Sequence, residues 1–520
     1  MTIYKKPIEL NEQFQKALDI MENTSKHAFI TGRAGTGKST LLDYFRNNTK
    51  KNIVVLAPTG VAALNVKGQT IHSFFRFKPG VTLQSVKKIK KAHNNIYREL
   101  DAIVIDEVSM VRADLMDCIA QFLMFNGNKH NQPFGGVQMI LIGDLYQLPP
   151  VVKEGEKEVF KHQYDSPFFF EARAMKEIDM EFIELDKVYR QRDESFINLL
   201  NTIRNNSITE EGLKILNRRY KPDFDPSMKD FFIWLTSTNE AANKINLDHL
   251  TLLKNEPVTY LGELTGDFKD ETLPTQMELR LKAGAQVMLL NNEPSGMWVN
   301  GSIGKITDIT VDPENIDVIT VELSTGDIVD VVPHKWELFN YQYDMDKKQI
   351  ESEVVGSFTQ YPLRLAWAVT IHKSQGKTFE RVVIDIGRGT FSTGQIYVAL
   401  SRCTSLDGIV LKKPVEKKHI FIDWRVVKFV TDFQYRLSDN LCSMDDKIAL
   451  IKNAIKDGKK LKIVYLKNND IKSIRVITPH FVGEMAYLDK KYVGIEAFCH
   501  ERNETRTFRI DRILEISDVN

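Results

Sequence analysis

Short runs of apolar residues alternate with amphipathic stretches along the first part of the chain. The runs are "HAFIT" (27–31), "NIVVLA" (52–57), "AIVI" (102–105) and "VQMILI" (137–142). Continuous apolar runs of this length, bounded by turn residues, predict strands that are buried on both faces. Helical patterns follow them, so we expect a doubly wound parallel sheet with its ligand site at the carboxyl ends of the strands.

The first strand leads into a glycine-rich segment, "GRAGTGKS" at 32–39, which fits the pattern GxxxxGK[ST]. Glycines allow successive backbone N–H groups to point at β- and γ-phosphates at a helix N-terminus, Lys38 adds a positive charge and Ser39 can bind Mg²⁺. A glycine-rich turn without a ligand is the alternative, and the flanking strand and helix favour the nucleotide site. The expected phosphate contacts are Gly32, Gly35, Thr36, Gly37, Lys38, Ser39 and Thr40.

Two further strands end in polar residues at the same predicted sheet edge. The "AIVI" strand delivers Asp106 and Glu107, of which Asp106 would hold Mg²⁺ and Glu107 would orient or deprotonate the attacking water. The "VQMILIGD" strand leads to Asp144 and Gln147, and Gln147 is a plausible sensor of the γ-phosphate. A pair such as Asp106–Glu107 is more often a surface pair, but its place after four apolar residues favours an ATPase.

Length and composition place this site in a multidomain globular protein. The chain has 520 residues, 42% of them apolar, which suggests three or four domains. Its four cysteines are widely spaced and form no CxxC pair, so we expect no disulfide framework and no zinc site, and a reducing, cytoplasmic setting. We find neither a signal-peptide pattern nor a long apolar span, which predicts a soluble protein.

The net charge of +1 does not itself indicate a polyanionic partner, but one segment is strongly basic. Between residues 76 and 98 the charged residues are Arg76, Lys78, Lys87, Lys88, Lys90, Lys91 and Arg98. Taken alone, this pattern is typical of a solvated helix face.

The order of motifs resembles that of superfamily 1 DNA helicases of the Pif/RecD type, over residues 8 to about 430. The segments that carry the resemblance are "LNEQ", "GRAGTGKST", "APTGVAALNVKGQTIHSFF", "DEVSM", "GDLYQLPP", "LDKVYRQ", "TIHKSQGKT" and "YVALSRCTS". The resemblance implies two RecA-like P-loop lobes with parallel sheets. It also implies that the basic stretch is a small wedge that meets a duplex fork.

Several residue roles follow from the resemblance. Gln13 is similar to the glutamine that recognises adenine, although an exposed helix residue is the alternative. Arg190 and Arg402 resemble the two arginines that the second lobe presents to the γ-phosphate, and Gly376 would lie near the nucleotide. These contacts would close the lobes when ATP is bound.

The second lobe is expected to have its own sheet, with strands in "FFIWLTST" (231–238), "RVVIDI" (381–386) and "IVL" (409–411). Hydroxyls and N–H groups at the ends of such strands could bind DNA phosphates. Phe74 is the aromatic available for base stacking, with a place in the core equally open. The candidate DNA contacts are Thr59, His72, Phe74, Thr238, Thr370, His372 and Lys373.

Two further segments break the motor pattern. From 261 to 361 alternating strands predict an SH3-like barrel inserted in the second lobe, in which Asn300 and Gly301 form a turn. After a polar boundary at 438–446, residues 440–520 resemble a WYL domain of the α+β class. The tripeptide after which WYL domains are named is replaced in this chain by Lys491, Tyr492 and Val493. The matching residues are Tyr465, Arg475, Pro479, Tyr492, Arg506, Phe508, Arg509 and Arg512. The arginines suit single-stranded nucleic acid or a solvated strand edge.

The resulting prediction is an ATP- and Mg²⁺-dependent DNA helicase that moves 5′ to 3′ on single-stranded DNA and unwinds duplexes in replication, repair or genome maintenance. The first lobe is expected at 1–180, the second at 181–260 and 362–437. We expect forked or tailed DNA as partner, a monomer in solution and no membrane association. The rival hypothesis is an ATPase switch in which the WYL domain senses a ligand or single-stranded nucleic acid.

Overall fold

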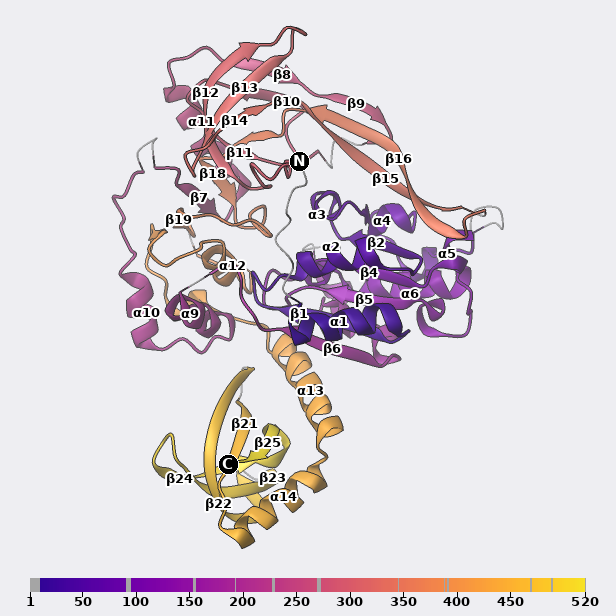
Figure 1. Ribbon diagram of the computed structural model, residues 1–520, viewed down its shortest axis with the longest axis vertical. Coiled ribbons are helices and arrows are strands. Elements are labelled where there is room, and N and C mark those ends of the chain that lie inside the picture. The colour runs from indigo at the N-terminus through magenta and orange to yellow at the C-terminus, as the bar shows by residue number, and fades with distance from the viewer. Residues whose placement is uncertain are drawn as a thin grey trace. The chain divides into compact units, whose positions relative to one another are not determined.

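The computed structural model describes residues 10–89, 95–152, 156–191, 193–226, 230–268, 273–344, 346–387, 389–390, 392–467, 470–487 and 490–519. The chain forms two compact units (Figure 1). The first contains residues 1–203 and 208–421, and the second contains 204–207 and 422–520. None of the described helices combines the length and apolar character that a membrane span requires.

A six-stranded parallel sheet forms the first lobe, in the order β3-β2-β4-β5-β1-β6. Its central strands are fully buried, which explains why they read as uninterrupted apolar runs. β6 pairs with β1, so this sheet extends to Leu185, beyond the boundary predicted at 180. The strands are β1 (His27–Gly32), β2 (Ile53–Ala57), β3 (Gln69–Thr70), β4 (Ala102–Ile105), β5 (Gln138–Ile142) and β6 (Met180–Leu185).

Helices of the first lobe follow the strands as the doubly wound pattern requires. They are α1 (Glu12–Asn23), α2 (Lys38–Asn48), α3 (Gly60–Asn65), α4 (Ile71–Phe74), α5 (Asn95–Glu99), α6 (Ala113–Asn126), α7 (Lys157–Lys161) and α8 (Arg173–Lys176). Apolar residues of α1 and α2 pack on the buried strands as one core, as the apolar faces of both helices predict.

The second lobe contains a four-stranded parallel sheet in the order β18-β7-β19-β20. Three of these strands are those predicted, and β18 is the addition. The elements of this lobe are α9 (Glu194–Arg204), α10 (Glu210–Asn217), β7 (Ile233–Thr236), α11 (Asn239–Leu252), β18 (Ala368–Thr370), β19 (Val382–Asp385), α12 (Gln395–Ser401) and β20 (Ile409–Leu411).

The insertion between α11 and β18 consists of antiparallel strands, as predicted, but it is larger than a small barrel. A five-stranded sheet, β14-β13-β12-β11-β17, is accompanied by the pair β10-β8 and by the sheet β15-β16-β9. The long hairpin of β15 and β16 runs from the insertion towards the first lobe (Figure 1), where the Tyr341 hydroxyl bonds to the backbone of Val55 in β2. The strands are β8 (Val258–Leu261), β9 (Glu263–Gly266), β10 (Glu278–Leu281), β11 (Gln286–Leu289), β12 (Ile303–Val311), β13 (Asp317–Leu323), β14 (Ile328–Val331), β15 (His334–Asp344), β16 (Gln349–Gln360) and β17 (Leu363–Leu365).

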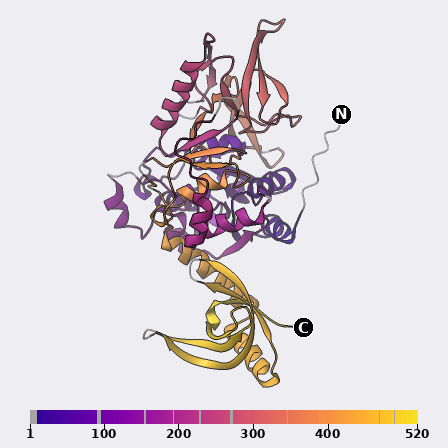
Figure 2. The same ribbon diagram turned by 90° about the vertical axis from the view of Figure 1, so that its left-hand side faces the viewer.

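The C-terminal unit has one five-stranded antiparallel sheet, β24-β23-β22-β21-β25, whose long strands bend strongly (Figure 2). This unit includes the chain from residue 422 onward, so α13 belongs to it, whereas the predicted boundary near 438 assigned most of this helix to the second lobe. Its elements are α13 (Trp424–Leu441), α14 (Met444–Asp457), β21 (Leu461–Lys467), β22 (Ile471–Tyr487), β23 (Lys490–Cys499), β24 (Glu504–Arg509) and β25 (Ile513–Asp518).

Candidate nucleotide site

A cavity of about 360 Å³ lies where the predicted phosphate loop meets residues of the second lobe. Its lining unites segments that are far apart in the sequence. The lining residues are Ala34, Gly35, Thr36, Gly37, Lys38, Ser39, Thr40, Glu107, Gln147, Tyr189, Arg190, Gly376, Thr378 and Arg402. Most of the predicted ATP-site residues are therefore brought together, although their roles stay predictions.

The phosphate loop has the backbone that its glycines predict. Gly35 and Gly37 have φ values of 82° and 88°, in the left-handed region that favours glycine. A Cβ on Gly35 would lie 2.5 Å from the Cβ of Arg190, so only a glycine allows this arginine so close to the loop. The Lys38 ammonium donates to the carbonyls of Gly32 and Arg33 at 2.7 and 3.0 Å, at the centre of the loop that would surround the phosphates.

Two carboxylates stand at the end of β4. Burial, followed by the charge of Glu107, raises the pKa of Asp106 to about 7. Burial also raises the pKa of Glu107, while the charge of Lys38 opposes this shift. Glu107 has a φ of 50°, a left-handed conformation that few non-glycine residues adopt. Its carboxylate can accept a proton from a water molecule in the cavity.

The residues around these carboxylates fit a divalent cation held with nucleotide phosphates. Among the described residues no three of His, Cys, Asp or Glu gather as a metal cluster. The Ser39 hydroxyl and the Asp106 carboxylate are hard oxygen ligands, and Mg²⁺ is usually bound by one or two such groups together with phosphate oxygens. When bound, the cation neutralises phosphate charge.

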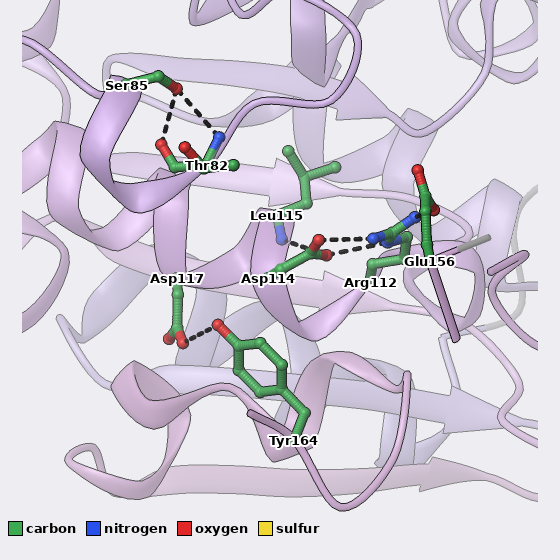
Figure 3. A network of polar contacts seen from close by, with 8 residues as sticks. All are labelled: Thr82, Ser85, Arg112, Asp114, Leu115, Asp117, Glu156 and Tyr164. Carbon is green, nitrogen blue, oxygen red and sulfur yellow. Dashed lines mark hydrogen bonds and ion pairs between the residues drawn. The ribbon is translucent and has the colours of Figure 1, made fainter. Parts of the chain in front are cut away.

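A polar network fixes the segments that follow Glu107 and Gln147 relative to each other (Figure 3). The Arg112 guanidinium, just before α6, pairs with Asp114 at 2.7 Å and with Glu156 at 2.6 Å. Nearby, the Tyr164 hydroxyl donates to Asp117 of α6 at 2.8 Å. Glu156 and Tyr164 both follow Gln147 in the chain, so the network ties the two motifs together away from the cavity.

The two predicted arginines are buried beside the cavity. Arg402 is 1% exposed, and burial, followed by the charge of Arg190, lowers its pKa to about 9. Its guanidinium donates to the carbonyls of Ser374 and Lys377 at 3.4 and 3.3 Å. Burial likewise lowers the pKa of Arg190, which donates to the carbonyl of Ser401 at 3.2 Å. Two buried positive charges facing one cavity favour an anionic ligand there.

Gln13 and Gln147 have different positions. Gln147 lines the cavity and is 6% exposed, and its backbone N–H donates to the Asp144 carbonyl at 3.0 Å. Gln13 is partly exposed on α1 and is not among the cavity-lining residues, and its amide lies 3.5 Å from Asp186. Its role in adenine recognition stays a prediction.

Two tyrosines were missed in the sequence. Tyr189 lines the cavity, is 44% exposed and lies near Gly37, where an aromatic ring can stack on a planar base. The Tyr397 hydroxyl, in α12, accepts a hydrogen bond from the Ala34 N–H. Both lie close in sequence to the predicted arginines, which was the available signal, but a tyrosine beside an arginine has no distinctive pattern.

The candidate DNA contacts differ in how exposed they are. Thr59 and Thr238 are exposed N-caps of α3 and α11, and each hydroxyl accepts a bond from a helix N–H. Lys373 is also exposed, whereas Thr370 is buried. Burial lowers the pKa values of His72 and His372, which favours neutral rings at neutral pH.

The structure places Phe74 in the core and not at a base-stacking position, which corrects the prediction that it contacts DNA. Its side chain is only 4% exposed and packs edge-on against Phe75, Tyr97 and Tyr341. The ring therefore belongs to the core beneath the basic stretch and is not available for base stacking. The apolar environment of Phe75, Phe77 and Phe122 explains why it turns inward.

The basic stretch does not form a single helix face. Its described lysines and arginines are exposed, but they are spread over a loop, a short 3₁₀ turn at Leu83–Ser85 and α5. Lys90 and Lys91 lie outside the described residues. The wedge stays a prediction.

In the C-terminal unit, aromatic and basic side chains gather on the sheet. Tyr465 packs edge-on against Phe508, and the Arg509 guanidinium lies over the Tyr492 ring. Burial, followed by the charges of Arg475, Arg502 and Arg506, lowers the pKa of Lys467. These four cations form a basic cluster, which we name by its residues Lys467, Arg475, Arg502 and Arg506.

Comparison with known proteins agrees with this geometry. The profile described as PIF1-like helicase matches residues 9–213, and the WYL domain profile matches 446–517. The chain is 31% identical over 438 residues to the ATP-dependent DNA helicase Pif1 of Bdellovibrio bacteriovorus, covering 82% of this chain and 93% of that protein. It is 30% identical over 474 residues to the helicase RRM3 of Saccharomyces cerevisiae, covering 77% of this chain and 64% of that longer protein.

Solved structures are similar over the same region. Pif1 from Bacteroides sp in complex with ADP-AlF4 has a TM-score of 0.74 and 34% identity, over 82% of this chain and 97% of that one. Pif1 from Candida albicans has a TM-score of 0.62 and 30% identity, over 82% of this chain and 99% of that one. The fold of this region is therefore shared with these proteins.

Proposed function

Since the chain belongs to the PIF1-like helicase family and carries a C-terminal WYL domain, we propose that it is an ATP-dependent DNA helicase that moves 5′ to 3′ on single-stranded DNA. The observation that carries this proposal is the cavity in which Arg190 and Arg402 face the phosphate loop. A site completed by residues of both lobes changes when the lobes separate, so it can convert hydrolysis into motion.

In the proposed reaction, Glu107 takes a proton from the attacking water while Lys38, Arg190 and Arg402 stabilise charge on the γ-phosphoryl group. Mg²⁺, held by Ser39 and Asp106, neutralises phosphate charge when bound. After hydrolysis the departing phosphate removes the anion that keeps the two arginines close to the loop. The lobes then relax, and the strand advances.

DNA is the proposed partner because helix N-termini with exposed hydroxyls occur in both lobes. Thr59 and Thr238 have this position, and backbone N–H groups with a capping hydroxyl bind phosphates well. Relatives support the assignment, since Bacteroides Pif1 has been solved bound to ssDNA, and another similar structure describes DNA unwinding at forked dsDNA by two coordinating Pif1 helicases. We propose a monomer that acts on forked or tailed DNA in replication, repair or genome maintenance.

The basic cluster supports a second, weaker contact with single-stranded DNA through the WYL domain. Arg475→Ala combined with Arg506→Ala should lower ssDNA affinity and its salt dependence, whereas Lys462→Ala, an exposed lysine of β21, should change neither. Unchanged affinity would assign the cluster to a solvated edge.

The four cysteines are free, which fits the proposed cytoplasmic setting.

The deciding experiment uses two matched duplexes, one with a 5′ and one with a 3′ single-stranded tail, with Mg·ATP and the Lys38→Ala variant as control. Unwinding of the 5′-tailed duplex alone is the expected result. Unwinding from the 3′ tail would reverse the proposed direction. Absence of unwinding, with slow hydrolysis that ssDNA does not stimulate, would favour the rival function as an ATPase switch.

A further inference from the structure

A polar bridge joins three separate parts of the motor at the turn between β11 and β12. The Asn300 amide nitrogen donates to Asn65 Oδ1 at 3.0 Å, and Asn65 is the last residue of α3 in the first lobe. The Asn300 amide oxygen accepts from Lys377 Nζ at 2.6 Å, and Lys377 belongs to the loop that follows β18 in the second lobe. One side chain of the insertion thus contacts both lobes.

The turn that carries Asn300 is held firmly. The Asn300 N–H donates to the side chain of Asn292 at 2.8 Å, and the Gly301 N–H donates to the Leu289 carbonyl at 2.8 Å. Gly301 has a φ of 103°, and a Cβ built there would lie 3.5 Å from the Lys377 side chain. The turn therefore packs along the aliphatic stem of Lys377, and the bridge is more than one hydrogen bond.

The loop around Lys377 also orients both arginines of the nucleotide site. The Lys377 carbonyl accepts from Arg402 at 3.3 Å, and the Gly376 carbonyl lies 3.5 Å from a nitrogen of Arg190. These contacts are made by backbone carbonyls, so they do not require the Lys377 side chain, but a pull on that side chain can move the loop and with it the two guanidinium groups. The ammonium is partly buried, which lowers its pKa and makes the Asn300 contact more important for it.

At its other end the bridge reaches a candidate DNA contact. Thr59 caps α3 at one end and Asn65 ends it, so the six-residue helix spans roughly 9 Å between phosphate contact and bridge. A DNA strand bound at Thr59 would fix α3, and through Asn65 it would fix Asn300.

We propose that Asn65, Asn300 and Lys377 are positioning residues that transmit DNA binding on the first lobe to Arg402 and Arg190, and so make ATP hydrolysis depend on DNA. This inference rests on the proposed helicase function. Without the bridge the site still binds ATP and hydrolyses it at its basal rate, but bound DNA no longer accelerates turnover.

The test compares the full-length protein with the variants Asn65→Ala, Asn300→Ala and Lys377→Met. Asn255→Ala, an exposed asparagine at the base of the insertion whose amide donates to the Ala283 carbonyl, is the matched control. Steady-state kcat and KM for ATP are measured with and without saturating oligo-dT, together with the Kd for oligo-dT. For Asn300→Ala and Lys377→Met the expected result is a loss of about tenfold in the ratio of stimulated to basal kcat, because a hydrogen bond to a charged group is lost. For Asn65→Ala the expected loss is roughly fivefold, because its bond to Asn300 joins two neutral amides.

A general structural defect would give a different pattern. Asn65 is exposed, so Asn65→Ala should fold normally and still lose stimulation. The double variant Asn300→Ala, Lys377→Met should be no worse than Asn300→Ala alone, since Asn300→Ala already removes the contact with Lys377. Wild-type stimulation in all three single variants, or additive losses in the double variant, would overturn the bridge. Failure of the helicase proposal itself would be visible in the wild type, as absence of both stimulation and unwinding.

Discussion

The Ala34 N–H, in the phosphate loop, donates a hydrogen bond of 3.0 Å to the hydroxyl oxygen of Tyr397, in helix α12 of the second lobe. The contact is buried, and Tyr397 lies five residues before Arg402. The loop that would hold the phosphates is thus joined directly to the helix that positions an arginine. In the proposed closed state the lobes would therefore share a protein contact in addition to the nucleotide.

Removal of this hydroxyl should weaken turnover more than binding. Tyr397→Phe keeps the ring and loses a hydrogen bond worth about 1 kcal/mol, which corresponds to a fall in kcat of roughly fivefold if the bond is made only in the closed state. Steady-state ATPase measurements with ssDNA present should show this fall with KM for ATP little changed. Tyr220→Phe, an exposed tyrosine, is the control, and equal kcat in both variants would exclude the closure role.

Arg402 should be required for its shape as well as for its charge. Arg402→Lys keeps a cation but cannot contact the Ser374 and Lys377 carbonyls while facing the cavity, so we expect kcat to fall by about 10²-fold or more. Nucleotide affinity, measured with a fluorescent ATP analogue, should change much less. Arg381→Lys, on the exposed side of the same lobe, should behave as wild type, and retention of kcat in Arg402→Lys would remove this residue from the chemistry.

Phe74 should contribute to stability and not to DNA affinity. Phe74→Ala removes a buried ring from an aromatic cluster and should lower the free energy of unfolding by about 3–5 kcal/mol. Phe74→Leu fills much of the volume, so it should fold and bind oligo-dT with wild-type affinity. Denaturant unfolding and fluorescence anisotropy check the two statements. A stable Phe74→Leu protein with weakened DNA binding would contradict the core assignment.

His27 should make the first lobe sensitive to acid. Burial lowers the pKa of His27 below its usual 6.5, and its Nδ1 accepts a hydrogen bond from the Met139 N–H at 3.0 Å. The unfolded chain therefore binds a proton more readily than the folded one, and the free energy of unfolding decreases as the pH falls through 6.5 towards the folded-state pKa.

The measurement is denaturant unfolding of wild type and His27→Gln at several pH values between 7.5 and 5, a range chosen to bracket the histidine pKa of about 6.5. The glutamine can still accept from Met139 but does not titrate in this range, so its stability should depend less on pH. Gln163→Asn, a change at an exposed residue that does not titrate, should keep the wild-type slope. An identical slope in all three proteins would assign the acid sensitivity to other groups.

Local pattern was sufficient where function depends on a short segment. The sequence predicted the strand that leads to Gly32, the helix after it, the strand end at Asp106 and the turn at Asn300–Gly301. These features were predictable because buried parallel strands are apolar throughout and tight turns require glycine. Family resemblance added Arg190 and Arg402, which the structure brings to the cavity.

Pattern was insufficient where a residue's neighbours come from distant parts of the chain. Phe74 has the same local sequence whether its ring faces DNA or the core, and only the rings of Tyr97 and Tyr341 decide between these. The hairpin of β15 and β16 was expected only as part of a small barrel, since strand alternation does not reveal that it runs to the first lobe.

By itself, then, the sequence determined the four central strands of the first sheet, the phosphate loop and the family, because each depends on residues that are adjacent in the chain or on a pattern of ordered motifs. Only the tertiary structure decided that Asn300 lies between Asn65 and Lys377, and that Tyr397 meets Ala34. Such contacts link residues that are tens to hundreds of positions apart, and their partners are chosen by packing and by the pairing of polar groups removed from water.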